Sequence, residues 1–222
     1  MSVDYPCFSS SSPDKTVFTE RFADGRISYY EDRPALIVSS TSWTDFERVR
    51  SEFPEHYPQL VVVITGKGPL KNKYISDIQS RDWQHVAVVT PWLTAEDYPK
   101  LLAASDVGVC LHFSSSGLDL PMKVVDMFGC NLPVMAISYP ALPELVKHNE
   151  NGLVFSTKEE LANLLQDWFR GFPKETAVKE TYYDFYKNIA SFRKLTWHLC
   201  WVCNVLPLFR DSRFEIDLTM IR

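Results

Sequence analysis

The residues best suited to chemistry in this 222-residue sequence lie between positions 114 and 129. An apolar run at 107–111 precedes them, so the pattern predicts a strand, a loop of serines and a glycine, and the first turns of a helix. Pro121 suits the opening turn of this helix, where its missing N–H costs nothing. Lys123 and Asp126 are three residues apart and share one helix face. Together they could bind a nucleotide sugar, with the lysine and backbone amides contacting the phosphates and the carboxylate accepting from the ribose hydroxyls. The alternative interpretation, without a ligand, is a capped surface helix on which these two side chains form an ion pair.

Two further loops, each following an apolar run, offer hydroxyls, an indole or glycines: Ser40, Ser42 and Trp43 in the first, and Gly66, Gly68 and Pro69 in the second. Parallel strands bring their carboxyl ends to one edge of a sheet, and ligands bind there. We therefore expect these loops to converge with the loop at 114–121 on a phosphate-bearing or nucleotide ligand. For the glycine loop, a tight turn between strand and helix without any ligand is the alternative.

The elements that must position these loops alternate along the chain. Six continuous apolar runs predict buried strands at 35–40, 60–65, 86–89, 107–111, 132–137 and 153–155. Helical patterns between and after them predict helices at 44–53, 69–78, 95–104, 121–129, 143–147, 158–169 and 182–195. This order predicts an α/β fold with a single Rossmann-like parallel sheet and helices on both faces.

The composition of the sequence indicates where the domain and its tails begin and end, and it argues against several classes of function. We expect a disordered tail at 1–16, a linker or edge segment at 17–33, the main domain at 34–210 and a frayed tail at 211–222. The net charge of −5 argues against nucleic-acid binding. The five cysteines are mostly in apolar context, and Cys200 and Cys203 have no second ligand pair. No signal peptide or membrane span is expected; the apolar stretch at 195–209 comes nearest.

The catalytic motifs are few. The glycine loop is not a dinucleotide fingerprint, because Lys71 stands where the third glycine is required. No Walker loop and no Gly-x-Ser-x-Gly elbow are present. His112 is either a packed side chain or a base, and Asp106 lies at the amino end of its strand, away from the expected site. Group transfer from an activated donor fits a polar site without a nucleophile, because positioning and stabilisation of the leaving phosphate can carry the reaction.

Several blocks of this sequence resemble the chitobiosyldiphosphodolichol beta-mannosyltransferase family: 39–44, 64–70, 90–93, 96–99 and 108–130. Blocks at 144–148 and 150–155 and the segment at 195–208 extend the resemblance. It implies the C-terminal half of a two-lobed GT-B enzyme that transfers mannose from GDP-mannose, with inversion, onto lipid-linked chitobiose. It also implies the cytosolic face of the endoplasmic reticulum membrane, no cofactor, and association with other dolichol-pathway glycosyltransferases.

The resemblance also implies roles for individual residues. Asp126 occupies the place of a glutamate that grips the ribose in related donor lobes. The second acidic position of that pattern falls on Leu118, with Asp119 one residue away as its substitute. Lys123 and the amides of Ser116 and Gly117 face the pyrophosphate, while the loop from Gly66 to Pro69 closes the pocket, and Ser40, Ser42 and Trp43 complete the donor site.

Two departures from the family pattern bear on activity. We expect the N-terminal lobe, with its membrane anchor and acceptor site, to be missing, and the crossover at 45–59 is short for a parallel connection. The isolated chain is therefore predicted to be inactive although its family is enzymatic. The alternative is a catalytically inactive truncated paralogue or splice form that acts as a nucleotide-sugar-binding or interaction module. An unrelated nucleotide-binding protein is disfavoured by the absent fingerprints.

Overall fold

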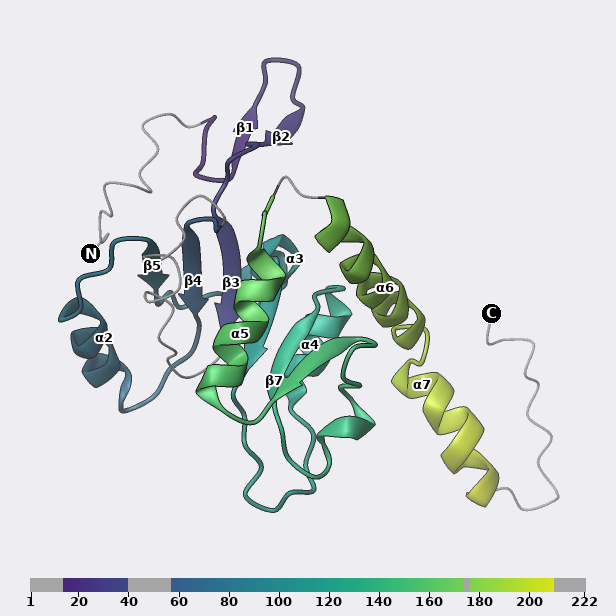
Figure 1. Ribbon diagram of the computed structural model, residues 1–222. Helices are drawn as coiled ribbons and strands as arrows, with labels where there is room; N and C mark the ends of the chain where they lie inside the picture. Colours follow the sequence, from purple (N-terminus) through teal and green to yellow (C-terminus); the bar gives the residue numbers. More distant parts are fainter. Residues whose placement is uncertain (1–13, 40–56, 174–175, 210–222) are drawn as a thin grey trace.

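The structure, a computed structural model, describes residues 14–39, 57–173 and 176–209 (Figure 1). Ser40, Ser42, Trp43 and the expected helix at 44–53 lie outside the described residues, as do most of the expected N-terminal tail and the whole of the C-terminal one. Their assignments stay predictions.

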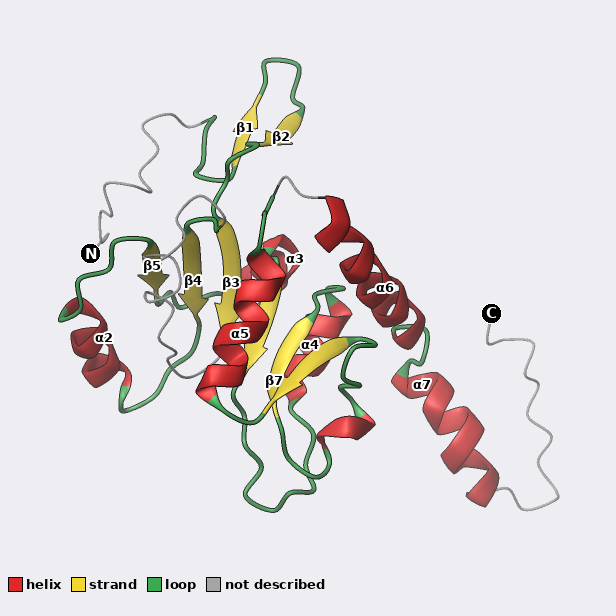
Figure 2. Cartoon of the chain, in the orientation of Figure 1, coloured by secondary structure: helices red, strands yellow, loops and turns green. Residues whose placement is uncertain are grey.

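The core of the fold is one six-stranded, all-parallel sheet in the order β5-β4-β3-β6-β7-β8, which confirms the predicted α/β class (Figure 2). Its strands are β3 (Ala35–Ser39), β4 (Leu60–Ile64), β5 (Val86–Val89), β6 (Val107–Cys110), β7 (Val134–Ile137) and β8 (Gly152–Phe155). The central strand β3 is buried at every residue. A continuous apolar run is what a strand covered on both faces requires.

Helices cover both faces of the sheet (Figure 1). On one face, Ile78 of α2 (Lys71–Gln79) and the apolar side of α5 (Lys158–Phe169) pack in one cluster with the strands. On the other, α3 (Asp97–Ala104) and α4 (Met122–Gly129) form a second cluster. Helix α6 (Thr176–Phe192) contributes to both clusters and so links the two layers.

The strand order places a topological switch between β3 and β6. From β3 the chain proceeds outward through β4 and β5, whereas from β6 it proceeds in the opposite direction through β7 and β8. Open α/β sheets bind ligands beyond the carboxyl ends of the strands at such a point. The chain leaves β4 and β6 at this edge, whereas the loop after β3 lies outside the described residues.

Outside the sheet, several predicted bounds were wrong or incomplete. Residues 17–33 include a hairpin, β1 (Thr19–Arg21) and β2 (Ile27–Tyr29), with its own antiparallel sheet. Helix α6 begins before the predicted residue 182. The predicted helix at 143–147 is only a 3-10 turn, Leu142–Glu144.

Candidate functional site

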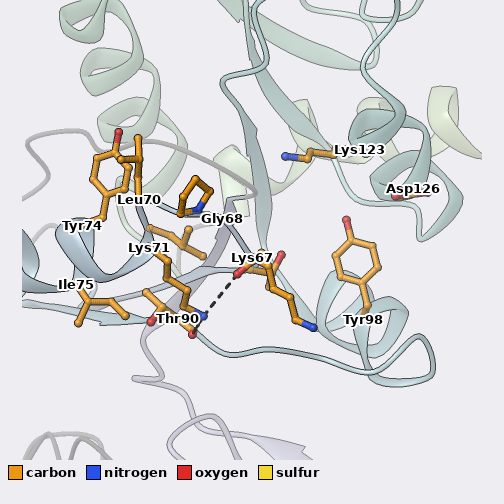
Figure 3. A pocket seen from close by; sticks show the side chains of 14 residues that line it. Lys67, Gly68, Leu70, Lys71, Tyr74, Ile75, Thr90, Tyr98, Lys123 and Asp126 are labelled. Carbon is orange, nitrogen blue, oxygen red and sulfur yellow. Dashed lines mark hydrogen bonds between the residues drawn. The ribbon is translucent and has the colours of Figure 1, made fainter.

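A cavity of about 720 Å³ opens at the carboxyl edge of the sheet, between the β4–α2 loop and helix α4 (Figure 3). The described residues that line it come from β4, the β4–α2 loop, α2, α3, α4 and the segment after β5: Ile64, Thr65, Gly66, Lys67, Gly68, Pro69, Leu70, Lys71, Tyr74, Ile75, Thr90, Tyr98, Lys123 and Asp126. Four separate stretches of the chain, at 64–75, 90, 98 and 123–126, therefore meet at one hollow, within the volume range of small-molecule sites.

The glycine loop forms one wall of this cavity and is fixed by Lys71. Gly66 has φ of +141°, a conformation that side chains with a Cβ rarely adopt. Nζ of Lys71 donates to the carbonyl of Thr90 at 2.9 Å and to that of Gly66 at 3.5 Å (Figure 3). Lys71, which stands where a dinucleotide fingerprint would need its third glycine, thus connects the glycine loop to the residue that follows β5.

Helix α4 forms the opposite wall. Its buried residues Val124, Met127 and Phe128 hold it against the sheet, so Lys123 and Asp126 both line the cavity. The prediction that these two side chains share a helix face is confirmed. Desolvation raises the pKa of Asp126 above its ordinary value. The cavity thus offers a cation and a partly desolvated carboxylate to one ligand.

Tyr98 on α3 is a cavity residue that the sequence analysis did not identify. Burial raises the pKa of its phenol, and the negative charge of Asp126 raises it further. That influence requires the two side chains to be near each other, as their positions on the cavity wall in Figure 3 show. Tyr98 can therefore act beside Asp126 as a hydrogen-bond donor.

A second cavity of about 330 Å³ adjoins the first and shares Thr65, Gly66 and Tyr98 with it. Its further lining includes Trp92, an exposed indole after β5. Nζ of Lys67 lies 3.8 Å from the centroid of the Trp92 ring, a cation–π contact. An exposed aromatic face is suited to stacking on a planar ring.

The loop after β6 is organised by its own side chains. Oγ of Ser114 and Oγ of Ser116 donate to the carboxylate of Asp119. The N–H of Gly117 donates to Oγ of Ser114 at 2.7 Å, and the N–H of Leu118 donates to Oγ of Ser116 at 3.2 Å. The amide of Gly117, expected to face a pyrophosphate, is thus already bound within the loop.

His112, the candidate base, belongs to the same network. Its Nε2 lies 2.7 Å from Oδ2 of Asp119, and its ring meets that of Tyr139 edge-on at 6.3 Å. Hydrogen bonds from Ser114 and then His112 lower the pKa of Asp119 to about 2. The buried hydroxyl of Tyr139 has no hydrogen-bond partner among the described residues.

The structure therefore divides the predicted site residues into two groups. Lys123, Asp126 and the loop from Gly66 to Pro69 meet at the large cavity. Of the described residues that line it, none comes from the segment 114–120, so Ser116, Gly117, Leu118 and Asp119 form a separate neighbouring cluster. Their roles toward a donor remain predictions.

Two other observations concern the described part of the chain. Its His, Cys, Asp and Glu side chains contain no group of three or more that could hold a metal ion. Within the same ranges, every helix is too short or too polar to cross a bilayer.

Comparison with known proteins assigns the class first. The family model of glycosyl transferases group 1 matches residues 42–170, more than half of the chain. The structure is similar to the C-terminal domain of a glycosyl transferase group 1 family protein, LpcC, from Francisella tularensis. The TM-score is 0.54 at 13% identity, over 74% of this chain and 86% of that one. The fold is thus that of the C-terminal half of a GT-B glycosyltransferase.

Sequence relatives then narrow the class. Human chitobiosyldiphosphodolichol beta-mannosyltransferase is 50% identical over 213 residues, covering 90% of this chain and 45% of the human protein. The human putative glycosyltransferase ALG1L2 is 51% identical over 162 residues, covering 72% of this chain and 75% of that protein. The chain belongs to the glycosyl transferases of group 1 and, within them, to the chitobiosyldiphosphodolichol beta-mannosyltransferase family. It spans about half the length of the mannosyltransferases it matches.

Proposed function

We propose that the large cavity binds GDP-mannose as the donor substrate of a beta-1,4-mannosyltransferase. The observation that carries this proposal is the meeting of Lys123, Asp126 and the Gly66–Pro69 loop in one hollow at the switch edge of the sheet. A diphosphate needs a cation and backbone donors, and ribose hydroxyls need an acceptor. The cavity supplies these groups on two facing walls.

The proposed binding mode assigns a part of the nucleotide to each wall. Lys123 and the loop of Gly66 and Gly68 face the diphosphate, Asp126 accepts from the ribose, and the adjoining cavity with Trp92 receives the base. Transfer with inversion breaks the bond between the anomeric carbon and the phosphate oxygen, so negative charge grows on the diphosphate. A fixed cation beside that charge lowers the barrier, and no cofactor is needed.

The family name supports a proposal for the acceptor, and the resemblance in sequence supports one for the location. We propose that the complete enzyme adds the first mannose to chitobiosyl-diphosphodolichol at the cytosolic face of the endoplasmic reticulum, in association with other glycosyltransferases of the dolichol pathway. The chain matches 45% of the human mannosyltransferase, so these 222 residues by themselves are proposed to hold the donor without transferring it. Mannose transfer to a chitobiosyl lipid by this chain alone would contradict that part of the proposal.

Calorimetry with GDP and with GDP-mannose tests the donor site. Replacing Asp126 by alanine removes hydrogen bonds to a charged acceptor, worth about 1.5–3 kcal/mol each, so affinity for both ligands should fall about tenfold or more. Lys123→Ala should weaken both as well. The matched control is Asp77→Ala, an exposed carboxylate on α2 outside the cavity lining. Equal affinities in Asp126→Ala and wild type would exclude the proposed ribose contact.

A further inference from the structure

Lys67, which stands between the two glycines of the loop after β4, connects the two cavities of the candidate site. Its side chain lines the large cavity, while its Nζ lies 3.8 Å from the centroid of the Trp92 ring, which lines the small one. Figure 3 shows this side chain extending from the loop toward Tyr98, a residue that both cavities share. A ligand that occupies both cavities therefore has to pass the lysine.

The contact between the ammonium and the indole is exposed and weak. Trp92 is 61% exposed, and Lys67 is exposed as well. A cation–π contact at an exposed site is equivalent to only about two- to fivefold in an equilibrium constant. Within the described residues, no carboxylate forms an ion pair with Lys67. The ammonium can therefore leave the ring for a stronger partner at little cost.

The glycine loop fixes the backbone next to Lys67 but leaves space around its side chain. Lys71 donates to the carbonyls of Gly66 and Thr90, so the start of the loop is held in place. A Cβ at Gly66 or Gly68 would meet nothing within 4 Å, which means that the loop is open on both sides of the lysine. The lysine stem is flexible, so its ammonium can move between the indole and the large cavity while the backbone stays in place.

A nucleoside diphosphate carries a suitable partner for each of these two side chains. Its base is planar, and stacking of a base on an aromatic side chain is stronger than an exposed cation–π contact. Its phosphates are negatively charged, and an ammonium donates charge-assisted hydrogen bonds to them. The base can therefore replace the ammonium on the indole, and the displaced ammonium gains a stronger partner in the diphosphate.

We propose that Lys67 is a donor-binding residue that changes partners when the nucleotide binds. Before binding, its ammonium covers the Trp92 ring; the guanine base then takes this place, and the released ammonium binds the diphosphate together with Lys123. This role rests on the proposed function, because it requires a nucleotide whose base and phosphates occupy the two cavities. Removing the lysine should then affect the base and the phosphates in opposite directions, which the proposed function alone does not predict.

The test compares guanosine, which has the base without phosphates, with GDP, using the full chain. Calorimetry measures GDP binding, and NMR titration measures the weaker guanosine. Lys67→Ala removes the competitor from the indole, so the affinity for guanosine should rise about two- to fivefold. The same substitution removes a cation from the diphosphate, so the affinity for GDP should fall about tenfold. A gain in affinity for one ligand cannot result from misfolding.

Two further lysine variants serve as controls. Lys67→Arg keeps the positive charge, so the affinity for GDP should return toward that of wild type. Lys73→Ala removes an exposed lysine of α2 that lies outside the lining of both cavities, and it should change neither affinity.

A substitution of Trp92 locates the competition at the indole. Trp92→Leu keeps an apolar side chain but loses the stacking surface, so the affinity for both ligands should fall. In this background Lys67→Ala should no longer raise the affinity for guanosine, yet it should still lower that for GDP. In wild type, the ring current of Trp92 shifts the NMR signals of the ε-methylene protons of Lys67. These signals should move to the ordinary lysine position as GDP binds.

Three results would overturn the inference. Equal losses of affinity for guanosine and GDP in Lys67→Ala would show that the lysine supports the base and does not compete with it. Unchanged affinity for guanosine in that variant would mean that the base stacks on the other face of the indole. Both results leave the proposed donor site in place. Absence of GDP binding by wild type would overturn the proposed function and this role of Lys67 together.

Discussion

Nε2 of His112 lies 2.7 Å from Oδ2 of Asp119, while the other carboxylate oxygen of Asp119 accepts from Ser114. An ionised carboxylate only accepts hydrogen bonds, so the imidazole donates through Nε2. The carboxylate thereby connects the end of β6 to the loop before α4. The pair fixes the shape of this loop, and the Ser114 hydroxyl in turn holds the amide of Gly117.

Replacing Asp119 by asparagine should destabilise the protein in a pH-dependent way. The folded pKa of about 2 lies below the ordinary value of about 3.9. The carboxylate therefore adds stability above about pH 4, and this contribution is lost as the pH falls toward 2. Urea unfolding at a series of pH values should show wild type more stable than the variant at pH 6, with the gap closing in acid. A gap that stays constant with pH would contradict the network.

Asp126 should behave in the opposite sense. Desolvation raises its pKa in the folded state, so its ionised form opposes folding at neutral pH and the penalty disappears below the ordinary pKa of about 3.9. Asp126→Asn should therefore raise the melting temperature at pH 7 and lose that advantage in acid, while it weakens GDP binding. Asp77→Asn, on exposed surface, should change neither quantity. A variant that is less stable at pH 7 would refute the desolvation argument.

The sheet and the α4 wall of the cavity could be predicted from the sequence, because both depend on the local periodicity of apolar residues. Each strand is a continuous apolar run, and Lys123 and Asp126 share a face because they are three apart on a helix whose other side is apolar. The helix predicted at 95–104 is α3, which begins two residues later at Asp97, where the N–H of Asp97 donates to Oγ of Thr94.

The remaining features depend on tertiary pairing or on backbone conformation. Tyr98 reaches Asp126 only because α3 packs beside α4, and Lys71 reaches Thr90 only because β4 and β5 are neighbours. The loop after β6 was expected to present the amide of Gly117 to a ligand. Its φ of +74° instead lets that amide meet the hydroxyl of Ser114, and such a turn is not encoded by residue type alone.

Gly152 should not tolerate a side chain. A Cβ at this position would lie 2.7 Å from the carbonyl oxygen of Val134 on the neighbouring strand β7, and backbone cannot move aside cheaply. Gly152→Ala should cost about 1–3 kcal/mol, which lowers the melting temperature by roughly 2–12 °C. Gly129→Ala is the control, because a Cβ there meets nothing within 4 Å and alanine favours the helix. Equal melting temperatures for the two variants would show that β7 and β8 can separate without cost.

The ion pair between Arg33 and Asp106 should contribute more to the free energy of unfolding than the exposed ion pairs of the described chain. The Arg33 guanidinium donates to both carboxylate oxygens of Asp106, at 2.9 and 2.6 Å, and the two side chains are only 13% and 15% exposed. The rings of Tyr29 and Phe172 lie 4.8 and 4.7 Å from it. Through its pair with Asp106, at the amino end of β6 as expected, Arg33 thus joins the hairpin and the segment after α5 to the sheet.

Arg33→Ala leaves the Asp106 carboxylate without its partner, so we expect a loss at the lower end of the roughly 3–5 kcal/mol typical of buried pairs. Arg33→Lys keeps the charge but loses the two-pronged geometry and the stacking, and should fall between alanine and wild type. Arg26→Ala is the matched control: its pair with Asp24 is exposed at 78% and 52%, so at most about 1 kcal/mol is at stake. Chemical denaturation of the three variants measures all of these differences. If Arg33→Ala and Arg26→Ala lose the same small amount, the hairpin is not held to the sheet through this ion pair.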